Sequence, residues 1–98
     1  MKFLVASFLL LGSITAQSQN VEKGAQLYGT CIQCHGEKGL GNVKEKAPRI
    51  AGQYDWYVYT QLVNFKAKKR KNEKMYPFIK NLSDQDYKDL AAFVSQLK

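Results

Sequence analysis

The sequence contains Cys31-Ile32-Gln33-Cys34-His35, in which two cysteines three positions apart are followed at once by a histidine. This is the pattern through which a c-type haem is attached. Each thiol can add to one of the two vinyl groups on a haem edge, and the imidazole that follows can then bind the iron as an axial ligand. The pentapeptide therefore predicts one haem c, bound covalently through Cys31 and Cys34, with His35 on the iron.

Zinc binding and thiol redox chemistry are the two alternatives for a Cys-x-x-Cys pair. Structural zinc needs four ligands, whereas the whole sequence has two cysteines and one histidine. A thioredoxin-like site requires a strand before the motif in a βαβ context, and no segment here alternates with period two for long. The haem interpretation is therefore favoured.

Residues 1–18 follow the order of a secretory signal peptide. Lys2 gives a positive start, the run from Phe3 to Leu11 is almost unbroken apolar sequence, and small and polar residues follow. Cleavage is expected after Ala16 or after Ser18, which leaves residues 19–98 as the mature domain. The apolar run is too short to favour a stable membrane span, so export without a span after cleavage is expected.

The mature chain is a small, basic domain. A core built from about eighty residues is marginal, and a disulfide between residues 31 and 34 would close too small a loop to add much. A buried haem would instead offer every helix a large apolar surface. The formal net charge of +7 becomes 7 − 1 = +6 once Lys2 is lost. That charge favours acidic partners, and export makes nucleic acid an unsuitable one.

Apolar residues at helical spacing predict an all-α fold of about three helices. The first helix follows a cap at Ser18 or Asn20, the second begins at an Asp55 cap, and the third follows a Ser83 cap. Segments 36–52 and 72–77 are predicted to be loops. The apolar positions of the three helices are, in order, Val21, Ala25, Tyr28 and Ile32; Val58, Tyr59, Leu62 and Phe65; Tyr87, Leu90, Ala91, Val94 and Leu97.

Few residues can supply a second axial ligand to the iron. The sequence has no second histidine, and Met1 would be lost with the signal, which leaves Met75. Met75 lies in a segment stiffened by Pro77. An isolated methionine would be assigned to core packing, but beside a haem motif Met75 is predicted to be the thioether ligand.

As a set, these features resemble the class I c-type cytochromes, especially the short monohaem periplasmic type and single halves of the dihaem type. The resemblance covers the mature region. It rests on Gly24-x-x-x-Tyr28, Cys31 to His35, Ala47-Pro48-Arg49-Ile50-Ala51-Gly52-Gln53, Met75, and Leu82-Ser83-Asp84 before Leu90-Ala91-Ala92-Phe93. It implies a small class I cytochrome c fold, in which helices pack around one covalently bound haem.

The resemblance also implies roles for two residues outside the motif. The carbonyl of Pro48 would accept a hydrogen bond from the second ring nitrogen of His35, which orients the imidazole. Gly24 would let the first helix cross close to the last, against Phe93 or Leu90. With His35 and Met75 both on the iron, the implied protein is a soluble periplasmic one-electron carrier and not an enzyme.

Two other functions remain open at this point. The chain would be a haem enzyme or gas-binding protein if Met75 does not bind iron. It would be the electron-transfer subunit of a larger dehydrogenase if the aromatic cluster Tyr54, Trp56, Tyr57 and Tyr59 forms an interface, although the cluster is expected to pack around the haem and the core. Redox protein partners with acidic surfaces would dock on lysines such as the run 66–71, unless that run only stabilises a helix C-terminus.

Overall fold

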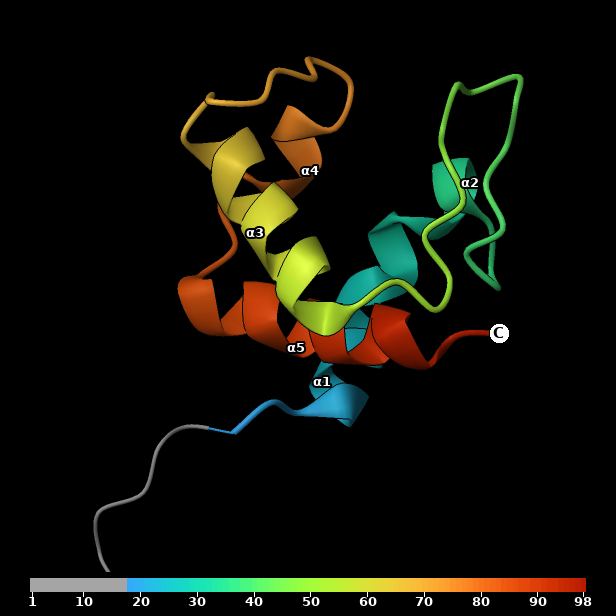
Figure 1. Cartoon of the computed structure of the whole chain (residues 1–98). Coiled ribbons are helices and arrows are strands. Elements are labelled where there is room, and N and C mark those ends of the chain that lie inside the picture. The colour runs from blue at the N-terminus through green and yellow to red at the C-terminus, as the bar shows by residue number, and fades with distance from the viewer. Residues whose placement is uncertain (1–17) are drawn as a thin grey trace, which may run out of the picture.

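The computed structural model describes residues 18–98, which form helices joined by loops, with no strand in that range. Figure 1 shows α5 lying across one end of the molecule, with α3 above it and α1 crossing it, while the loops after α2 and after α3 extend away from it. The helices are α1 (Val21–Leu27), α2 (Ile32–His35), α3 (Asp55–Lys66), α4 (Tyr76–Ile79) and α5 (Asp84–Gln96), with a 3-10 turn at Tyr28–Thr30. The all-α expectation is confirmed.

The predicted signal peptide lies outside the described residues, apart from Ser18 itself. Within residues 18–98, no helix combines the length and the apolar character needed to cross a bilayer.

Side-chain caps begin two of the three long helices as the sequence predicts. The side chain of Asn20 accepts a hydrogen bond from the backbone N–H of Lys23 at 3.0 Å. Ser83 and Asp86 form a reciprocal capping box at the start of α5, with both hydrogen bonds at 3.0 Å. These bonds satisfy N–H groups that have no partner inside the helix.

Three expectations about helix ends are wrong. Asp55 is the first residue of α3 rather than its cap, which is Tyr54; its carboxylate still lies where the helix dipole favours it. The first predicted helix divides at a 3-10 turn, which tightens the chain before Ile32. The segment 72–77 becomes helical at Tyr76, because Pro77 is tolerated in the first turn of a helix.

The close crossing of α1 on α5 joins the first and last helices of residues 18–98. A Cβ atom on Gly24 would lie 2.1 Å from the backbone oxygen of Asp89 and 2.8 Å from the Cβ of Phe93. Asp89 itself is buried, and its carboxylate accepts hydrogen bonds from the backbone N–H of Asn20 at 2.8 Å and from the side chain of Gln85 at 2.9 Å. The crossing expected from the resemblance is therefore present, with Phe93 and the backbone of Asp89 as the neighbours of Gly24.

The core lies where α1, α3, α4 and α5 meet. Tyr87 links two of these helices, because its hydroxyl donates to the carbonyl of Ile79 at 2.7 Å. Ile79 and Tyr28 are the largest side chains that are almost completely buried. The buried cluster consists of Tyr28, Leu62, Phe65, Ile79, Tyr87, Leu90 and Val94.

Two of the four aromatic residues at the start of α3 are largely exposed, which contradicts for those two the expectation that the cluster packs around the haem and the core. Tyr54 and Trp56 are 67% and 64% exposed, and their rings stack at a centroid distance of 5.8 Å. Tyr57 is 39% exposed and meets Trp56 edge to face. The inward side of α3 is already occupied by Leu62 and Phe65, so the rings of Tyr54 and Trp56 point to solvent. Tyr57 lines the larger of the cavities beside the Cys31–His35 motif, and Tyr59 packs against the core, as expected.

Candidate functional site

The Cys31–His35 motif is presented by a single helical turn. Cys31 is the N-cap of α2, and the helix closes with a hydrogen bond from the N–H of His35 to the carbonyl of Cys31 at 2.9 Å. Gly36 ends the turn at a φ of 88°, a conformation that favours glycine. Cys31 and Cys34 are both partly buried and are not joined in a disulfide.

Burial raises the pKa of two groups at the motif, the Tyr28 hydroxyl and the Cys31 thiol. The hydroxyl of Tyr28 donates to the carbonyl of Gly36 at 2.7 Å, and burial raises the pKa of Tyr28 to about 12. Tyr28 therefore stays protonated and keeps this bond at neutral pH. Burial also raises the pKa of the Cys31 thiol, which disfavours the reactive thiolate form.

The imidazole of His35 is held in one orientation. The ring is 6% exposed, and its Nδ1 lies 2.9 Å from the carbonyl oxygen of Pro48. Because a carbonyl can only accept, Nδ1 must carry the proton, which leaves a lone pair on Nε2 for a metal.

The loop that carries Pro48 is itself closed. Asn42 and Ala47 exchange two backbone hydrogen bonds of 2.8 and 3.0 Å, and the N–H of Gly41 donates to the carbonyl of His35 at 2.8 Å. A Cβ atom on Gly41 would lie 2.7 Å from the backbone nitrogen of Arg49. Glycine at position 41 therefore allows the two sides of the loop to approach and brings Pro48 onto the His35 ring.

Two adjoining cavities lie beside the motif, with volumes of about 310 and 60 Å³. The five predicted site residues, Cys31, Cys34, His35, Pro48 and Met75, all line the smaller cavity, and all but Cys34 also line the larger one. The larger volume falls within the range of cofactor sites, about 300–1,000 Å³. Its remaining walls are mainly apolar side chains of the core, including Leu62, Phe65, Ile79, Leu90 and Val94.

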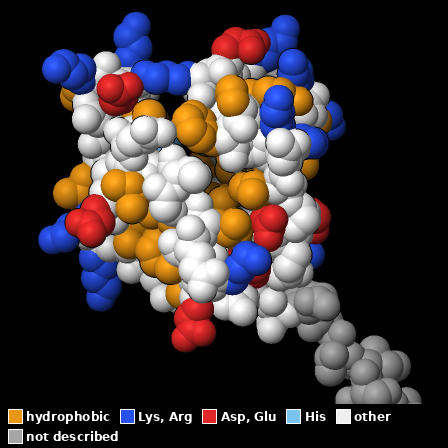
Figure 2. Space-filling view, turned by 180° about the vertical axis from the view of Figure 1, so that it is seen from behind, with side chains coloured by type: hydrophobic (Ala, Val, Ile, Leu, Met, Phe, Trp, Pro, Cys, Tyr) orange, Lys and Arg blue, Asp and Glu red, His pale blue; other side chains and the backbone are white. Residues whose placement is uncertain are grey.

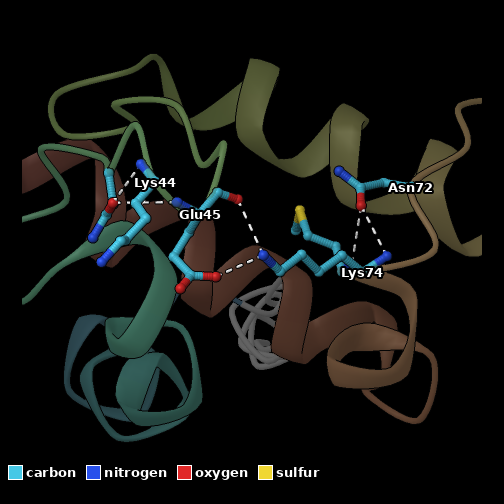
Figure 3. A network of polar contacts seen from close by, with 6 residues as sticks. Lys44, Glu45, Asn72 and Lys74 are labelled. Carbon is cyan, nitrogen blue, oxygen red and sulfur yellow. Dashed lines mark hydrogen bonds and ion pairs between the residues drawn. The ribbon is translucent and has the colours of Figure 1, made fainter.

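Met75 enters this site from the turn that precedes α4. Its side chain is partly buried and packs against the core. The side-chain oxygen of Asn72 accepts hydrogen bonds from the backbone N–H groups of Lys74 at 3.0 Å and Met75 at 3.1 Å. Figure 3 shows this turn facing the loop that bears Glu45, with Lys74 reaching across to it. The ammonium of Lys74 lies 2.6 Å from the carboxylate of Glu45, and this hydrogen bond raises the pKa of Lys74.

Sequence reasoning missed the polar rim of the larger cavity. Arg49 and Arg70 line it together with Gln53 and Gln61. Arg70 donates to the side-chain oxygen of Gln61 at 2.6 Å, and its guanidinium lies 4.7 Å from the ring centre of Phe65. Guanidinium groups are suited to carboxylates, so this rim can receive acidic substituents. Arg70 could have been noticed as the single arginine in a run of lysines.

The donor set fits a haem better than a zinc ion. Within residues 18–98, no three His, Cys, Asp or Glu side chains come together as a metal-binding group. The site instead offers one imidazole nitrogen, one thioether sulfur and two thiols around an apolar cavity. Imidazole and thioether are axial ligands of haem iron in electron carriers, and paired thiols are its covalent anchors.

A small helical domain with this site is of the c-type cytochrome class. The chain belongs to the cytochrome c family, since the family model described as "Cytochrome c" matches residues 21–98. The family implies a covalently bound haem c and a domain suited to electron transfer.

Relatives of known sequence and structure agree with this assignment. The chain is 41% identical over 69 residues to a cytochrome c4 of Thiocapsa roseopersicina, covering 70% of this chain and 35% of the relative. It is 39% identical over 69 residues to a "thiosulfate dehydrogenase electron acceptor" of Thiomonas intermedia, covering 70% and 32%. A solved cytochrome c4 of Acidithiobacillus ferrooxidans superposes with a TM-score of 0.74 at 30% identity, over 87% of this chain and 54% of that one.

These comparisons confirm the class I fold. They also show that the chain spans about a third of the length of the two curated relatives and about half of the solved one. The similarity therefore extends over only part of each of these longer proteins.

Proposed function

We propose that the chain is a soluble periplasmic carrier of single electrons, with one haem c bound to Cys31 and Cys34 and with His35 and Met75 as the axial ligands. The proposal is supported mainly by one observation: all five predicted site residues line the smaller cavity, and the His35 ring is oriented there by its hydrogen bond to Pro48. Once bound, the haem would supply the one-electron couple between ferric and ferrous iron.

The residues of the chain would bind, orient and shield that group. Each S–H of Cys31 and Cys34 would add across a vinyl group, so that a carbon–sulfur bond forms and the hydrogen goes to the neighbouring carbon, with no oxidant required. The hydrogen bond from Nδ1 of His35 to Pro48 raises the basicity of the imidazole. The soft thioether of Met75 favours the ferrous state and so raises the reduction potential. Arg49 and Arg70 would face the haem propionates.

Replacing Met75 with alanine tests the ligand assignment. We expect the ferric holoprotein to lose the long-wavelength charge-transfer band of Met–iron coordination, and its ferrous form to bind carbon monoxide rapidly, because the sixth position would be open. Absorption spectra and stopped-flow mixing give both readouts. Val43→Ala is the control, since it shortens a side chain that is 95% exposed and lines neither cavity, and it should leave the band in place. A wild-type protein that lacks the band and binds carbon monoxide rapidly would contradict the proposal and favour a gas-binding protein.

Exposed lysines on both sides of the site would steer an acidic partner. Lys46 and Lys74 line the smaller cavity from opposite loops, and Lys and Arg side chains gather on two lobes beside an apolar strip in Figure 2. Charges of one sign around a docking surface raise association rates, and salt screens them.

We therefore expect the rate of electron transfer to an acidic redox partner to fall about tenfold or more when ionic strength rises from about 10 mM to about 0.5 M. The measurement is stopped-flow oxidation of the reduced holoprotein. A Lys46→Gln variant should show a weaker dependence than wild type. A rate that does not change with salt would rule out electrostatic docking at this face.

A second candidate is the electron acceptor of a dehydrogenase. The relative from Thiomonas intermedia is described as a thiosulfate dehydrogenase electron acceptor. The exposed rings of Tyr54 and Trp56 in this chain could form a stable contact with such a partner. Gel filtration of a native extract separates the two candidates, because a carrier would elute at the size of this chain and a subunit would elute with its complex.

A further inference from the structure

We propose that Asn72, Lys74 and Glu45 form a clasp that keeps Met75 in the cavity and so limits how often another ligand can take its place. The clasp consists of the Asn72 turn and of the ion pair that ties this turn to the facing loop. It rests on the proposed ligation by Met75, and its three residues act through Met75 as positioning residues.

The first part of the clasp fixes the backbone from which Met75 extends. The side-chain oxygen of Asn72 accepts from the N–H groups of Lys74 and Met75, at 3.0 and 3.1 Å. The carbonyl of Asn72 accepts from the N–H of Tyr76 at 3.0 Å. Three consecutive backbone N–H groups around Met75 are therefore bound to one residue, so this turn cannot change its internal shape, and with it the direction of the Met75 side chain, without losing several hydrogen bonds at once.

The second part ties this turn to the opposite side of the site. The ammonium of Lys74 lies 2.6 Å from a carboxylate oxygen of Glu45 and 3.2 Å from its carbonyl oxygen. Two ion pairs are found within residues 18–98, Lys74–Glu45 and Lys88–Asp84. The second lies inside one helix, whereas the first joins segments that are 29 positions apart. Lys74 and Glu45 both line the smaller cavity, so their ion pair lies at its edge.

Glu45 is in turn held by a turn of the same kind. The side-chain oxygen of Asn42 accepts from the N–H groups of Lys44 and Glu45, at 2.8 and 3.2 Å. Figure 3 shows Lys44 and Glu45 on one side of the ion pair and Asn72 on the other. The loop of Glu45 also carries Pro48, which binds His35. The clasp therefore connects the backbone that positions His35 with the backbone that positions Met75.

The ion pair is exposed, which sets the scale of the effect. The side chains of Lys74 and Glu45 are 58% and 37% exposed, and pairs in such positions change an equilibrium by about two- to five-fold. The two hydrogen bonds to Asn72 together should matter more, by about tenfold. The clasp thus tunes the lifetime of a closed state without being needed for folding.

A charge swap in the haem-loaded protein tests the ion pair. The readout is the rate at which imidazole binds to the ferric protein, followed by loss of the Met–iron band, because imidazole can bind only when Met75 leaves. We expect Glu45→Lys and Lys74→Glu each to raise this rate about two- to five-fold at low ionic strength. The double variant, which restores an opposite-charge pair, should return close to the wild-type rate.

Lys44→Glu is the matched control for Lys74→Glu. It makes the same change in net charge one residue away from Glu45, on an exposed side chain for which no ion pair is found, and should leave the rate near that of wild type. Asn72→Ala should accelerate imidazole binding about tenfold. Asn72→Asp keeps a side-chain oxygen that can accept both hydrogen bonds, so its rate of imidazole binding should stay close to that of wild type.

The outcomes separate the clasp from the function on which it rests. If wild-type protein has the Met–iron band but the single variants bind imidazole at the wild-type rate, or if the double variant fails to restore it, the clasp is overturned and Met75 ligation stands. A similar acceleration in Lys44→Glu would also overturn the clasp, since net charge alone would explain it. Absence of the band from wild type would overturn the clasp and the proposed ligation together.

Discussion

A Cys31→Ala, Cys34→Ala variant produced without haem is expected to lose most of its helical structure. The cavity of about 310 Å³ lies at the centre of the packed helices, and core residues of α3, α4 and α5 form its walls. Without a bound group, these apolar side chains would face water or an empty space, and both are costly. The helices cannot compensate, because isolated helices shorter than about 12 residues are marginal in water, and α2 and α4 have four residues each.

Far-UV circular dichroism measures the effect directly. The variant should retain less than about a third of the helical signal of the holoprotein and show no cooperative thermal unfolding. Wild-type chain purified without haem should behave in the same way, which separates loss of the haem from loss of the thiols. Adding haem to the variant should recover part of the helix signal through noncovalent binding. A strongly helical, cooperatively unfolding variant without haem would show that the protein core suffices alone.

The Gly24→Ala substitution is expected to destabilise the holoprotein by about 2 kcal/mol or more. Alanine favours a helix over glycine by about 1 kcal/mol. Against this gain, the new Cβ would lie 2.1 Å from the backbone oxygen of Asp89, and a helix backbone cannot move aside as a flexible side chain can. Overpacking of this kind costs about 3 kcal/mol, so the clash outweighs the gain in propensity.

Thermal unfolding of the holoprotein checks this result, with an expected fall in Tm of about 8–16 °C. Gly29→Ala is the matched control, because Gly29 is exposed and a Cβ there would meet nothing within 4 Å. Its Tm should stay near that of wild type. Equal effects of the two substitutions would mean that glycine flexibility, rather than the close crossing at Gly24, determines the outcome.

Local sequence signals predicted the parts of the fold that depend on local interactions. The caps at Asn20 and Ser83 and the apolar face of α5 could be recognised because each depends on residues within a few turns. Met75 could be selected by elimination among possible ligands. The split of the first helix and the short helix α4 were missed, because a single turn has too few residues to show a helical period.

Contacts between distant segments could not be predicted in this way. Nothing in the order of residues pairs Glu45 with Lys74 or places the backbone of Asn20 on the carboxylate of Asp89. The exposure of Trp56 is of the same kind: its apolar character suggested burial, but Leu62 and Phe65 occupy the inward side of α3. The resemblance to a family supplied Pro48 and the role of Gly24, because both act through the folded arrangement.

The crossing of α1 on α5 also bears on the order in which the domain can close. The bond between Asn20 and Asp89 joins residues 69 positions apart, so the packing of α1 requires α5 to be in place. Bringing such distant segments together has an entropic cost that grows with the length of the loop between them. We therefore expect the thiols of the Cys31–His35 turn to be most accessible for haem attachment before this crossing forms.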